Sequence, residues 1–321
     1  MRAAVLGCGA IGAGRGAPPH PDVGVMTHVG AYRACPDTDL VAVCDSDLAR
    51  ASAVGVSAFT EPAELLAQAA PELVSVATPD STHAELLELC LRSDGVRGIL
   101  AEKPLALDSP TARRLVALAR ERGVVLAVNY SRRYSPMLRA LDTAALGPLQ
   151  HVSGAYVKGL AHNGTHWLDL LRMLAGEPVA VRGSDRLKED GQDPTLDAEL
   201  HLAGGAGARM AALDTAAFTA FEMELTGTRG RLRIADSGHL LERFEVADDP
   251  RHPGYRVLVE AERVQGALRD GTLNAVRDLV RCVRDGGEPA CRGEDGVAVL
   301  DLVAAIRASA ARGGELLRCA P

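Results

Sequence analysis

Short apolar runs alternate with amphipathic stretches through the first 128 residues, and this alternation restricts the possible folds more than any other feature. Five of the runs have the length and composition of buried strands: Arg2–Leu6, Leu40–Cys44, Leu73–Ala77, Gly98–Ala101 and Val124–Val128. Helical patterns lie between them, as at Thr111–Arg122, where Leu115, Leu118 and Ala119 share one face. Strands that alternate with helices predict a doubly wound parallel sheet of the α/β class.

The pattern changes near Asn129, where alternating polar and apolar residues replace the continuous apolar runs. Such period-2 stretches predict a large open sheet that is mostly antiparallel. They are Val179–Ser184, Leu196–Leu202, Ala208–Thr215, Phe221–Thr226, Arg231–Ile234 and Leu240–Val246. Helices are predicted at Met137–Ala145, Thr165–Ala175, Leu273–Arg284 and Gly296–Ala311. We therefore expect two domains, residues 1–128 and residues 129–321, the second of the α+β class.

The composition excludes several classes of protein. A net charge of −7 leaves no general basic surface for nucleic acid, and no apolar run reaches the roughly 18 residues that span a bilayer. Seven cysteines without a Cys-x-x-Cys pair are simplest to read as thiols in a reducing compartment. Because a strand pattern begins at Arg2, we expect no signal peptide and a cytoplasmic protein.

The turn after the first strand carries Gly7, Gly9 and Gly12, with Cys8, Ala10 and Ile11 between them. In dinucleotide-binding sheets the first glycine permits a tight turn, the second lets the backbone approach a pyrophosphate, and the third allows close helix–strand packing. Backbone N–H groups at the following helix start would hold the diphosphate. The position of the motif predicts a dinucleotide site, and the alternative is a glycine-rich turn without a ligand.

An acidic residue, Asp45, ends the second predicted strand. A carboxylate there accepts hydrogen bonds from the adenosine ribose and repels a 2′-phosphate, so it predicts NAD over NADP. The alternative is that Asp45 caps the helix beginning near Leu48. Asp47 is better placed for that cap, which leaves Asp45 for the ribose.

The spacing between the glycines and Asp45 is unusual. The acidic residue commonly lies about 20 residues beyond the glycines, whereas Asp45 lies 33 beyond Gly12. The segment Ala13–Met26 contains three glycines and three prolines and cannot form a regular helix. We interpret it as an inserted loop, with the helix resuming near Thr27. It is either a surface loop without a role or a flap over cofactor or substrate.

Two further motifs follow predicted parallel strands at their carboxyl ends, where open α/β sheets bind ligands. Thr78-Pro79 with His83 follows one strand, and Glu102-Lys103-Pro104 follows another. An amine near a cationic nicotinamide loses its proton more readily, so Lys103 could take the proton of a secondary alcohol while the cofactor takes the hydride. The alternatives are a structural His83 in a first helical turn and a surface lysine at 103.

His162 and His166 lie four residues apart at the start of a predicted amphipathic helix, which puts both imidazoles on one face. Either ring could orient a substrate hydroxyl or act as an acid–base group, and Asn163 could cap the helix. The spacing also suggests zinc, but no third ligand is evident and no glutamate separates the histidines, so we expect no metal.

A polar segment, Asn129–Tyr134, follows the last predicted parallel strand and lies at the domain junction. Its residues Tyr130, Arg132 and Arg133 could contact substrate, the arginines by pairing with a phosphate. A structural role at the junction is equally compatible with the sequence.

Together these motifs resemble the glucose–fructose oxidoreductase/inositol dehydrogenase (Gfo/Idh/MocA) family. The resemblance covers nearly the whole chain, including Gly293-Glu294-Asp295-Gly296, which begins the final helix. It implies a Rossmann domain plus a mostly antiparallel α/β domain whose sheet often forms subunit contacts, and hence a homodimer or homotetramer. It also implies NAD(P)-dependent alcohol–ketone chemistry on sugars, cyclitols or nucleotide-linked sugars.

The resemblance further implies roles for single residues. The lysine of the Glu-Lys-Pro motif, here Lys103, is catalytic in that family, and its peptide bond to the proline is often cis. The histidine that matches His166 contacts the reacting hydroxyl. The chain departs from the family pattern at His162, where many members carry an aspartate, so Lys103 loses a possible carboxylate partner. This departure and the long loop after Gly12 bear on the substrate rather than on the cofactor.

We therefore expect an NAD-dependent oxidoreductase that acts on a secondary alcohol of a sugar. A reductase of a keto-sugar, cyclitol or imine and a non-catalytic NAD-binding sensor are the alternatives. The expected catalytic residues are Lys103, His162 and His166. The expected cofactor contacts are Gly7, Gly9, Ala10, Ile11, Gly12, Asp45, Thr78, Pro79, His83, Glu102 and Lys103. The expected substrate contacts are Lys103, Tyr130, Arg132, Arg133, His162, Asn163 and His166.

Overall fold

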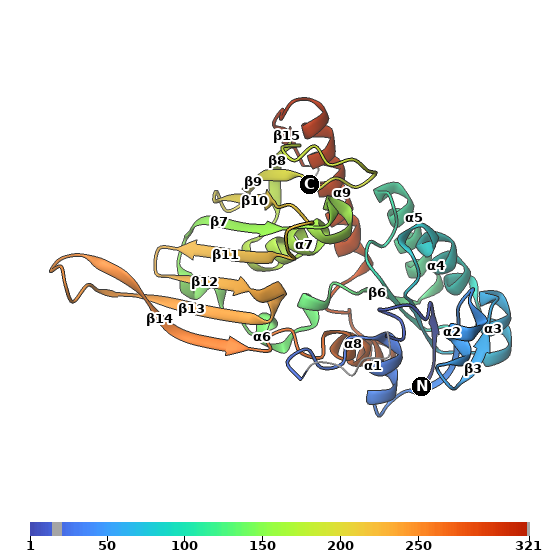
Figure 1. The fold of residues 1–321 in the computed structure, drawn as a ribbon. Coiled ribbons are helices and arrows are strands. Elements are labelled where there is room, and N and C mark those ends of the chain that lie inside the picture. Colours follow the sequence, from blue (N-terminus) through green and yellow to red (C-terminus); the bar gives the residue numbers. More distant parts are fainter. Residues whose placement is uncertain (15–20, 320–321) are drawn as a thin grey trace. The chain divides into compact units, whose positions relative to one another are not determined.

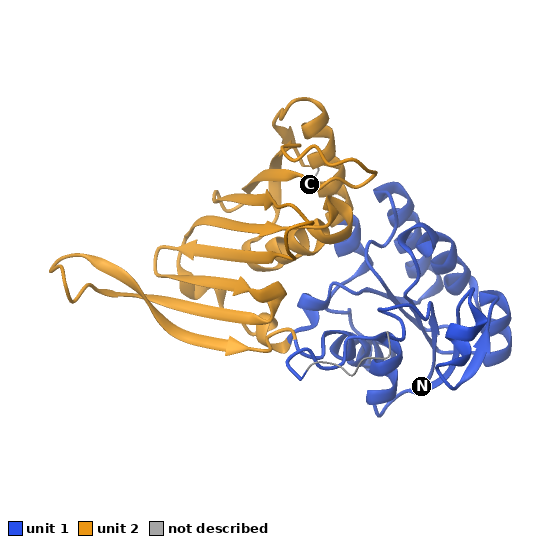
Figure 2. Ribbon diagram, in the orientation of Figure 1, with its two compact units in different colours: residues 1–135, 269–298 blue, residues 136–268, 299–321 orange. Residues whose placement is uncertain are grey.

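The computed structural model describes residues 1–14 and 21–319 (Figure 1). The middle of the predicted insertion, residues 15–20, therefore lies outside the described residues. The chain divides into two compact units, which Figure 2 shows in separate colours. Unit 1 comprises Met1–Ser135 and Arg269–Ala298, and unit 2 comprises Pro136–Leu268 and Val299–Pro321.

Unit 1 is built on a six-stranded parallel sheet with the order β3-β2-β1-β4-β5-β6. Its strands are β1 (Arg2–Leu6), β2 (Asp39–Cys44), β3 (Ser57–Phe59), β4 (Leu73–Val76), β5 (Gly98–Ala101) and β6 (Val125–Val128). The order reverses between β1 and β4, and ligands of doubly wound sheets bind at the carboxyl ends of the strands beside such a reversal. The predicted doubly wound parallel sheet is confirmed.

The helices of unit 1 cover both faces of this sheet. They are α1 (His28–Ala34), α2 (Leu48–Ser52), α3 (Pro62–Ala69), η1 (Asp80–Thr82), α4 (His83–Arg92), α5 (Ser109–Arg122), η2 (Ser131–Tyr134) and α8 (Gly271–Asp285). Helix α8 packs against α1 and against β5, while α4 packs against α3 and α5. A Cβ on Gly98 of β5 would lie 2.7 Å from Val283 of α8, so a larger residue there would require the side chains of α8 to shift.

The units differ from the two continuous domains, 1–128 and 129–321, that the sequence suggested. Unit 1 continues to Ser135 because the segment after β6 stays bonded to it: Asn129 N donates to Ala101 O at 2.8 Å, and Tyr134 Oη to Val128 O at 3.0 Å. It also includes α8 and the first part of α9 (Gly293–Ala311), since α8 covers β5 and β6.

Unit 2 contains a nine-stranded sheet with the order β14-β13-β12-β11-β7-β10-β9-β8-β15. Its strands are β7 (Leu149–Tyr156), β8 (Pro178–Ser184), β9 (Asp197–Leu202), β10 (Gly207–Ala212), β11 (Phe221–Gly227), β12 (Gly230–Ala235), β13 (Leu240–Asp248), β14 (Arg256–Gln265) and β15 (Leu317–Arg318). Between its named strands the sheet is antiparallel except for the pair β7–β10. The predicted mostly antiparallel sheet is confirmed.

One face of this sheet is covered by helices. Helix α7 (Thr165–Ala175) packs on β7 and β11, where Trp167 Nε1 donates to Glu222 O at 3.0 Å. The end of α9 packs on β8, where Ser309 Oγ accepts from Gly183 N at 2.9 Å. Because exposed and buried residues alternate along β8 to β11, the second face is polar and open.

Two elements differ from the sequence-based expectations. The stretch Met137–Ala145 is not one helix: it divides into α6 (Pro136–Arg139) and a 3₁₀ turn, η3 (Thr143–Leu146), because Asp142 caps a new turn by accepting from Ala144 N at 3.1 Å. Strand β14 was not predicted from the sequence, because residues 256–265 are mostly exposed and carry charges on both faces. The remaining short elements of unit 2 are η4 (Gly159–Gly164), a π-helical turn, and η5 (Asp236–Gly238).

Candidate active site

The glycine loop follows β1 and contacts the end of β4. Gly7 has φ +96°, and a Cβ on it would lie 2.4 Å from Ala77 O. A Cβ on Gly12 would lie 1.9 Å from Gly7 O, so both glycines are required by packing. A Cβ on Gly9 would meet no atom of the described residues within 4 Å, although the motif demands glycine there. The second glycine therefore leaves an open surface, and Ala10 and Ile11 beside it are exposed.

The first helix is interrupted by the insertion. A single turn follows the loop, with Ala13 N donating to Gly9 O at 2.9 Å. Helix α1 then begins at His28 and donates back to that turn, from His28 N to Ile11 O at 3.1 Å and from Val29 N to Gly12 O at 2.9 Å. Thr27 caps α1, so the predicted resumption of the helix near Thr27 is confirmed. The two parts together supply the helix that the motif requires.

Asp45 lies at the end of β2, 9% exposed, and holds the glycine loop. Its Oδ2 accepts from Cys8 N at 2.8 Å and its Oδ1 from Asp47 N at 2.9 Å. Asp47 is the cap of α2, accepting from Ala49 N and Arg50 N, as the sequence suggested. Arg50 Nη1 lies 3.7 Å from Asp45 Oδ1 on a largely exposed side chain. A carboxylate oxygen accepts more than one hydrogen bond, so Asp45 keeps acceptor capacity for a ribose hydroxyl.

Thr78, Pro79 and His83 follow β4, next to the glycine loop. His83 is buried, and its Nδ1 lies 2.7 Å from Pro104 O while its Nε2 lies 2.9 Å from Thr78 O. Both ring nitrogens are thus engaged by backbone carbonyls, which supports the structural alternative for His83. The ring connects the turn after β4 to the Glu-Lys-Pro segment after β5 and so fixes the relative positions of two motifs.

Glu102 is a nearly buried carboxylate at the end of β5, with a side chain that is 12% exposed. Its Oε1 accepts from His28 Nε2 at 3.0 Å and from Asn129 Nδ2 at 2.7 Å, and its Oε2 accepts from Lys103 N at 3.2 Å. Burial by itself raises the pKa of Glu102. The hydrogen bond and charge of His28, the charge of Lys103 and the amide of Asn129 outweigh burial and hold that pKa below its usual range.

Lys103 follows Glu102 directly and is half-buried, and its peptide bond to Pro104 is cis. It is one of only three lysines in a chain with 35 lysine and arginine residues. Arginine is effectively always protonated, whereas a lysine amine can release and take up a proton. A lysine at this position, in a chain that mostly uses arginine, is compatible with an acid–base role.

The segment after β6 packs within unit 1. Tyr130 and Arg132 are buried, 1% and 6% exposed. Arg133 Nη1 lies 3.4 Å from Asp295 Oδ1 in the first turn of α9, and both side chains are largely buried. This ion pair supports the structural alternative for Arg133.

In unit 2, His162, Asn163 and His166 lie on a continuous helical segment formed by η4 and α7. His162 is exposed, and His166 is half-buried in the first turn of α7. Asn163 does not cap α7, because its Nδ2 donates to Val157 O at 2.9 Å and Gly164 occupies the cap position. The π-helical turn carries one additional residue, and such turns frequently occur at functional sites.

A carboxylate outside the predicted site anchors this segment. Asp193, in the connection between β8 and β9, accepts from Ala161 N and His162 N, each at 2.8 Å. Arg307 of α9 donates to the same carboxylate at 2.6 Å, and Thr195 Oγ1 accepts from Gly159 N at 3.0 Å. Asp193 could not be predicted from the sequence, because 31 residues separate it from the His162 backbone that it binds.

Replacing Asp193 with alanine should loosen this segment. The variant leaves two backbone N–H groups without their acceptor, so we expect the free energy of unfolding to fall by about 1–2 kcal/mol. Urea unfolding of the purified variant measures this change. Asp185→Ala removes an exposed carboxylate from the same connection and should cost far less. Equal losses in the two variants would contradict an anchoring role for Asp193.

The described residues contain neither a metal centre nor a membrane-spanning helix. No group of three or more His, Cys, Asp and Glu side chains in residues 1–14 and 21–319 is arranged to hold a metal ion. Nor does any helix in these ranges have the length and apolar character needed to cross a membrane. All seven cysteines lie within the described ranges and are thiols rather than disulfides.

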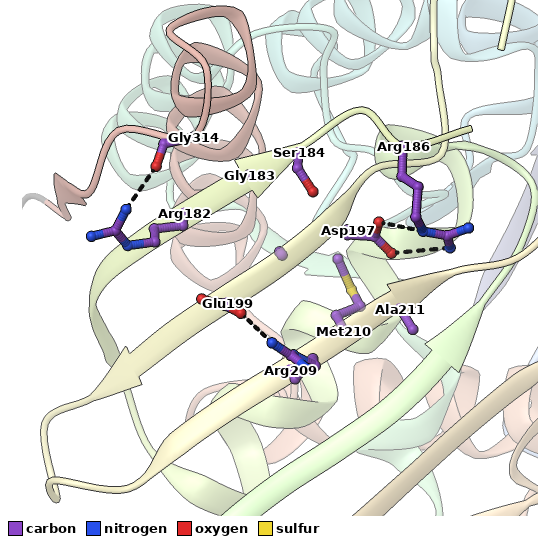
Figure 3. A pocket seen from close by; sticks show the side chains of 11 residues that line it. Arg182, Gly183, Ser184, Arg186, Asp197, Glu199, Arg209, Met210, Ala211 and Gly314 are labelled. Atoms are coloured by element: carbon purple, nitrogen blue, oxygen red, sulfur yellow. Dashed lines mark hydrogen bonds and ion pairs between the residues drawn. The ribbon is translucent and has the colours of Figure 1, made fainter. Parts of the chain in front are cut away.

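A hollow of about 450 Å³ lies on the open face of the sheet in unit 2, and contains none of the predicted site residues (Figure 3). It is lined by β8, β9 and β10 and by Gly314, whose carbonyl accepts from Arg182 at 3.0 Å. Arg186 pairs with Asp197, and Arg209 pairs with Glu199. Two of its three arginines are therefore paired with carboxylates of β9, and the third, Arg182, donates to the carbonyl of Gly314.

Comparison with known proteins agrees with this architecture. Residues 1–130 match the family model described as "Oxidoreductase family, NAD-binding Rossmann fold". Residues 159–316 match the companion model, "Oxidoreductase family, C-terminal alpha/beta domain". The chain belongs to the Gfo/Idh/MocA oxidoreductase family. The resemblance read from its motifs is thereby confirmed, and unit 1 is an NAD(P)-binding Rossmann domain.

Relatives within the Gfo/Idh/MocA family act on several sugars. The chain is 27% identical to D-apiose dehydrogenase of Paraburkholderia graminis, over 89% of this chain and 84% of that protein. It is 29% identical to dTDP-3,4-didehydro-2,6-dideoxy-alpha-D-glucose 3-reductase of Streptomyces violaceoruber, over 90% and 93%. Among solved structures, UDP-N-acetylglucosamine 3-dehydrogenase of Acidithiobacillus ferrooxidans has a TM-score of 0.78 and 25% identity, with 96% and 97% coverage. The chain is thus an NAD(P)-dependent oxidoreductase of a family that acts on sugars.

Proposed function

We propose that this chain is an NAD-dependent dehydrogenase that interconverts a secondary alcohol and a ketone on a sugar, with Lys103 as the acid–base group. The observation that carries the proposal is a half-buried lysine beside a nearly buried carboxylate, Glu102, at the carboxyl end of β5. The glycine loop follows β1 at the same edge of the sheet. This is the edge at which doubly wound sheets bind their ligands.

The residues around the glycine loop fit a dinucleotide. The surface at Gly9 admits a close ligand, since a Cβ there would meet no described atom. The predicted contacts at Gly7, Ala10, Ile11 and Gly12 belong to the same loop, and Thr78, which precedes Pro79, borders it. Asp45 stands where the adenosine ribose is bound in this fold, and its charge disfavours a 2′-phosphate. We therefore propose NAD as the cofactor in preference to NADP.

The proton transfer follows from the properties of Lys103. The nicotinamide, when bound, accepts a hydride from the carbon, and the protein must then accept the hydroxyl proton. As a neutral amine, Lys103 Nζ takes that proton during oxidation, and as an ammonium it returns the proton during reduction. Glu102 holds the backbone of Lys103 through its N–H at 3.2 Å. Within the described residues, buried Asn129 Oδ1 accepts no hydrogen bond and could receive a ligand donor.

We assign the orientation of the substrate hydroxyl to His166, with His162 and Asn163 as further substrate contacts. Both histidines project from a segment that Asp193 fixes at Ala161 and His162. An imidazole near neutrality can donate to or accept from a hydroxyl, which suits a group that alternates between alcohol and ketone. Tyr130, Arg132 and Arg133 remain predicted substrate contacts. We propose that the two arginines act mainly by supporting the structure of the segment after β6.

Sugars are the proposed substrates because relatives along most of the chain act on them, and nucleotide-activated sugars are the first candidates. One such relative is a dehydrogenase of UDP-N-acetylglucosamine, and another is a reductase of a dTDP-linked keto-sugar. The second favours a competing proposal, reduction of a keto-sugar with NAD(P)H. The two proposals share the residues and differ in the direction of the proton and the hydride.

The test is formation of NADH from NAD with a panel of free sugars, cyclitols and nucleotide sugars, run beside the same panel with NADP. Turnover with one sugar class and NAD supports the proposal. Turnover only with NADP would contradict the role given to Asp45. No turnover with any substrate, despite tight NADH binding, would favour the reductive function or a non-catalytic NAD sensor.

We also propose that the open face of the nine-stranded sheet forms the contact of a homodimer or homotetramer. Exposed residues alternate with buried ones along β8 to β11, so this face offers a polar surface on which a second copy could pack in a self-complementary way. Light scattering coupled to gel filtration measures the mass, and a monomer at micromolar concentration would refute the proposal.

A further inference from the structure

A series of buried polar groups leads from the interior of unit 1 to Glu102. Tyr32 Oη and Ser75 Oγ are 3.0 Å apart, and Ser75 Oγ is 2.9 Å from His28 Nδ1. His28 Nε2 continues the series to Glu102 Oε1 at 3.0 Å. Tyr32, Ser75 and His28 are each 0% exposed. Burying such groups is costly unless all are hydrogen-bonded, so their presence behind Lys103 requires an explanation.

The hydrogen positions in this series follow from the acceptor at its end. An ionised Glu102 only accepts, so His28 Nε2 must carry a proton. His28 Nδ1 then either accepts from the Ser75 hydroxyl or, in the doubly protonated ring, donates to it. The hydroxyls of Ser75 and Tyr32 can rotate to suit either state. The series can therefore orient the imidazole toward Glu102 whatever the charge of the ring.

We infer that the Tyr32–Ser75–His28 series fixes Glu102 as an oriented carboxylate behind Lys103, which makes His28 a positioning residue for the proton transfer. The inference rests on the function proposed above. Glu102 shares its oxygens among His28 of α1, Asn129 after β6 and the backbone of Lys103. In the described part of the chain, the titratable groups facing Glu102 are His28 and Lys103. Loss of the His28 contact leaves the carboxylate less stabilised and less constrained.

The expected kinetic effect concerns the pH dependence of kcat. A carboxylate beside the Lys103 amine favours its protonated form. In His28→Leu, Glu102 loses the donor His28 and becomes easier to protonate. Where Glu102 takes up a proton, its charge no longer favours the ammonium form of Lys103, so the amine should lose its proton at lower pH. We expect the acidic limb of kcat to move down by about one pH unit, a tenfold change in proton affinity. Ser75→Ala should move it in the same direction by less.

A conservative variant separates positioning from packing. His28→Gln keeps a donor that can reach Glu102 but cannot titrate, and it should restore the acidic limb close to that of the wild type. NADH affinity and melting temperature, measured in parallel, report structural damage. If His28→Leu loses stability without moving the limb, or if His28→Gln behaves like His28→Leu, the inference is wrong.

A readout independent of turnover keeps this inference separate from the proposed function. In protein labelled with ¹⁵N-histidine, the His28 signals are identified by their loss in His28→Gln. We expect a protonated Nε2 throughout the stable pH range and a change at Nδ1 in Ser75→Ala. An unprotonated Nε2 would overturn the inference even in an active enzyme. The expected signals in a protein that oxidises no sugar would contradict the proposed function alone.

Discussion

Replacing Lys103 with methionine should lower kcat by about 10²–10⁴-fold, the range typical for loss of a general acid–base group. Methionine keeps most of the length of the side chain but has no amine. The affinity for NADH should change little, because the glycine loop follows β1 and Asp45 follows β2, whereas Lys103 follows β5. Steady-state kinetics with the sugar found by the panel, together with NADH fluorescence titration, measure both quantities.

The matched control is Lys188→Met, which removes another of the three lysines from an exposed turn of unit 2. Its kcat should equal that of the wild type. If turnover by the Lys103 variant stays within a fewfold of the wild type, another group transfers the proton. A large loss of NADH affinity in the Lys103 variant would instead indicate that the lysine mainly supports the cofactor.

Replacing Asp45 with asparagine should reverse or abolish the preference for NAD. The change removes one negative charge beside the ribose site, and hydrogen bonds to charged groups contribute about 1.5–3 kcal/mol. The Kd of NADH should therefore rise about 10–100-fold. NADPH should bind more tightly, because the repulsion of the 2′-phosphate is gone and Arg50, 3.7 Å from Asp45, becomes available to it.

Asp47→Asn provides the control for charge, since this carboxylate lies two residues away and caps α2. It should leave the ratio of the two affinities unchanged. The ratio is the decisive quantity, because Asp45 also binds Cys8 N and its loss could weaken both cofactors together. An unchanged ratio in Asp45→Asn, measured by fluorescence titration with NADH and NADPH, would show that Asp45 only supports the glycine loop.

The fold could largely be predicted because its strands are buried and its motifs are local. Strands β1 and β5 begin and end where the apolar runs do, and the helix at Thr165–Ala175 has the predicted bounds. The sequence-based predictions are wrong where the alternation of buried and exposed residues is absent or where contacts are distant in sequence. Strand β14 is exposed on both faces, and the return of α8 to unit 1 depends on contacts across more than a hundred residues. No local sequence signal encodes such a contact.

The candidate site divides in the same way. Motif residues such as Gly7, Asp45 and Lys103 could be found because their spacing from a strand end has a chemical reason. The residues that hold these motif residues in place could not be found from the sequence. His28 and Ser75 reach Glu102 from other elements, and Asp193 binds a segment 31 residues away. The scarcity of lysine is a sequence feature that supports the interpretation of Lys103.

The interrupted first helix has a consequence for how this protein can vary. His28 N donates directly to Ile11 O and Val29 N donates to Gly12 O. Helix α1 therefore continues the turn after the glycine loop through two hydrogen bonds that do not involve the residues inserted between Gly12 and His28. The entropy of closing a loop grows only slowly with its length. The junction after Gly14 can therefore accept segments of different length and composition at little cost to the cofactor loop. It is a natural point for evolution, or for a protein engineer, to add a new function beside an old site.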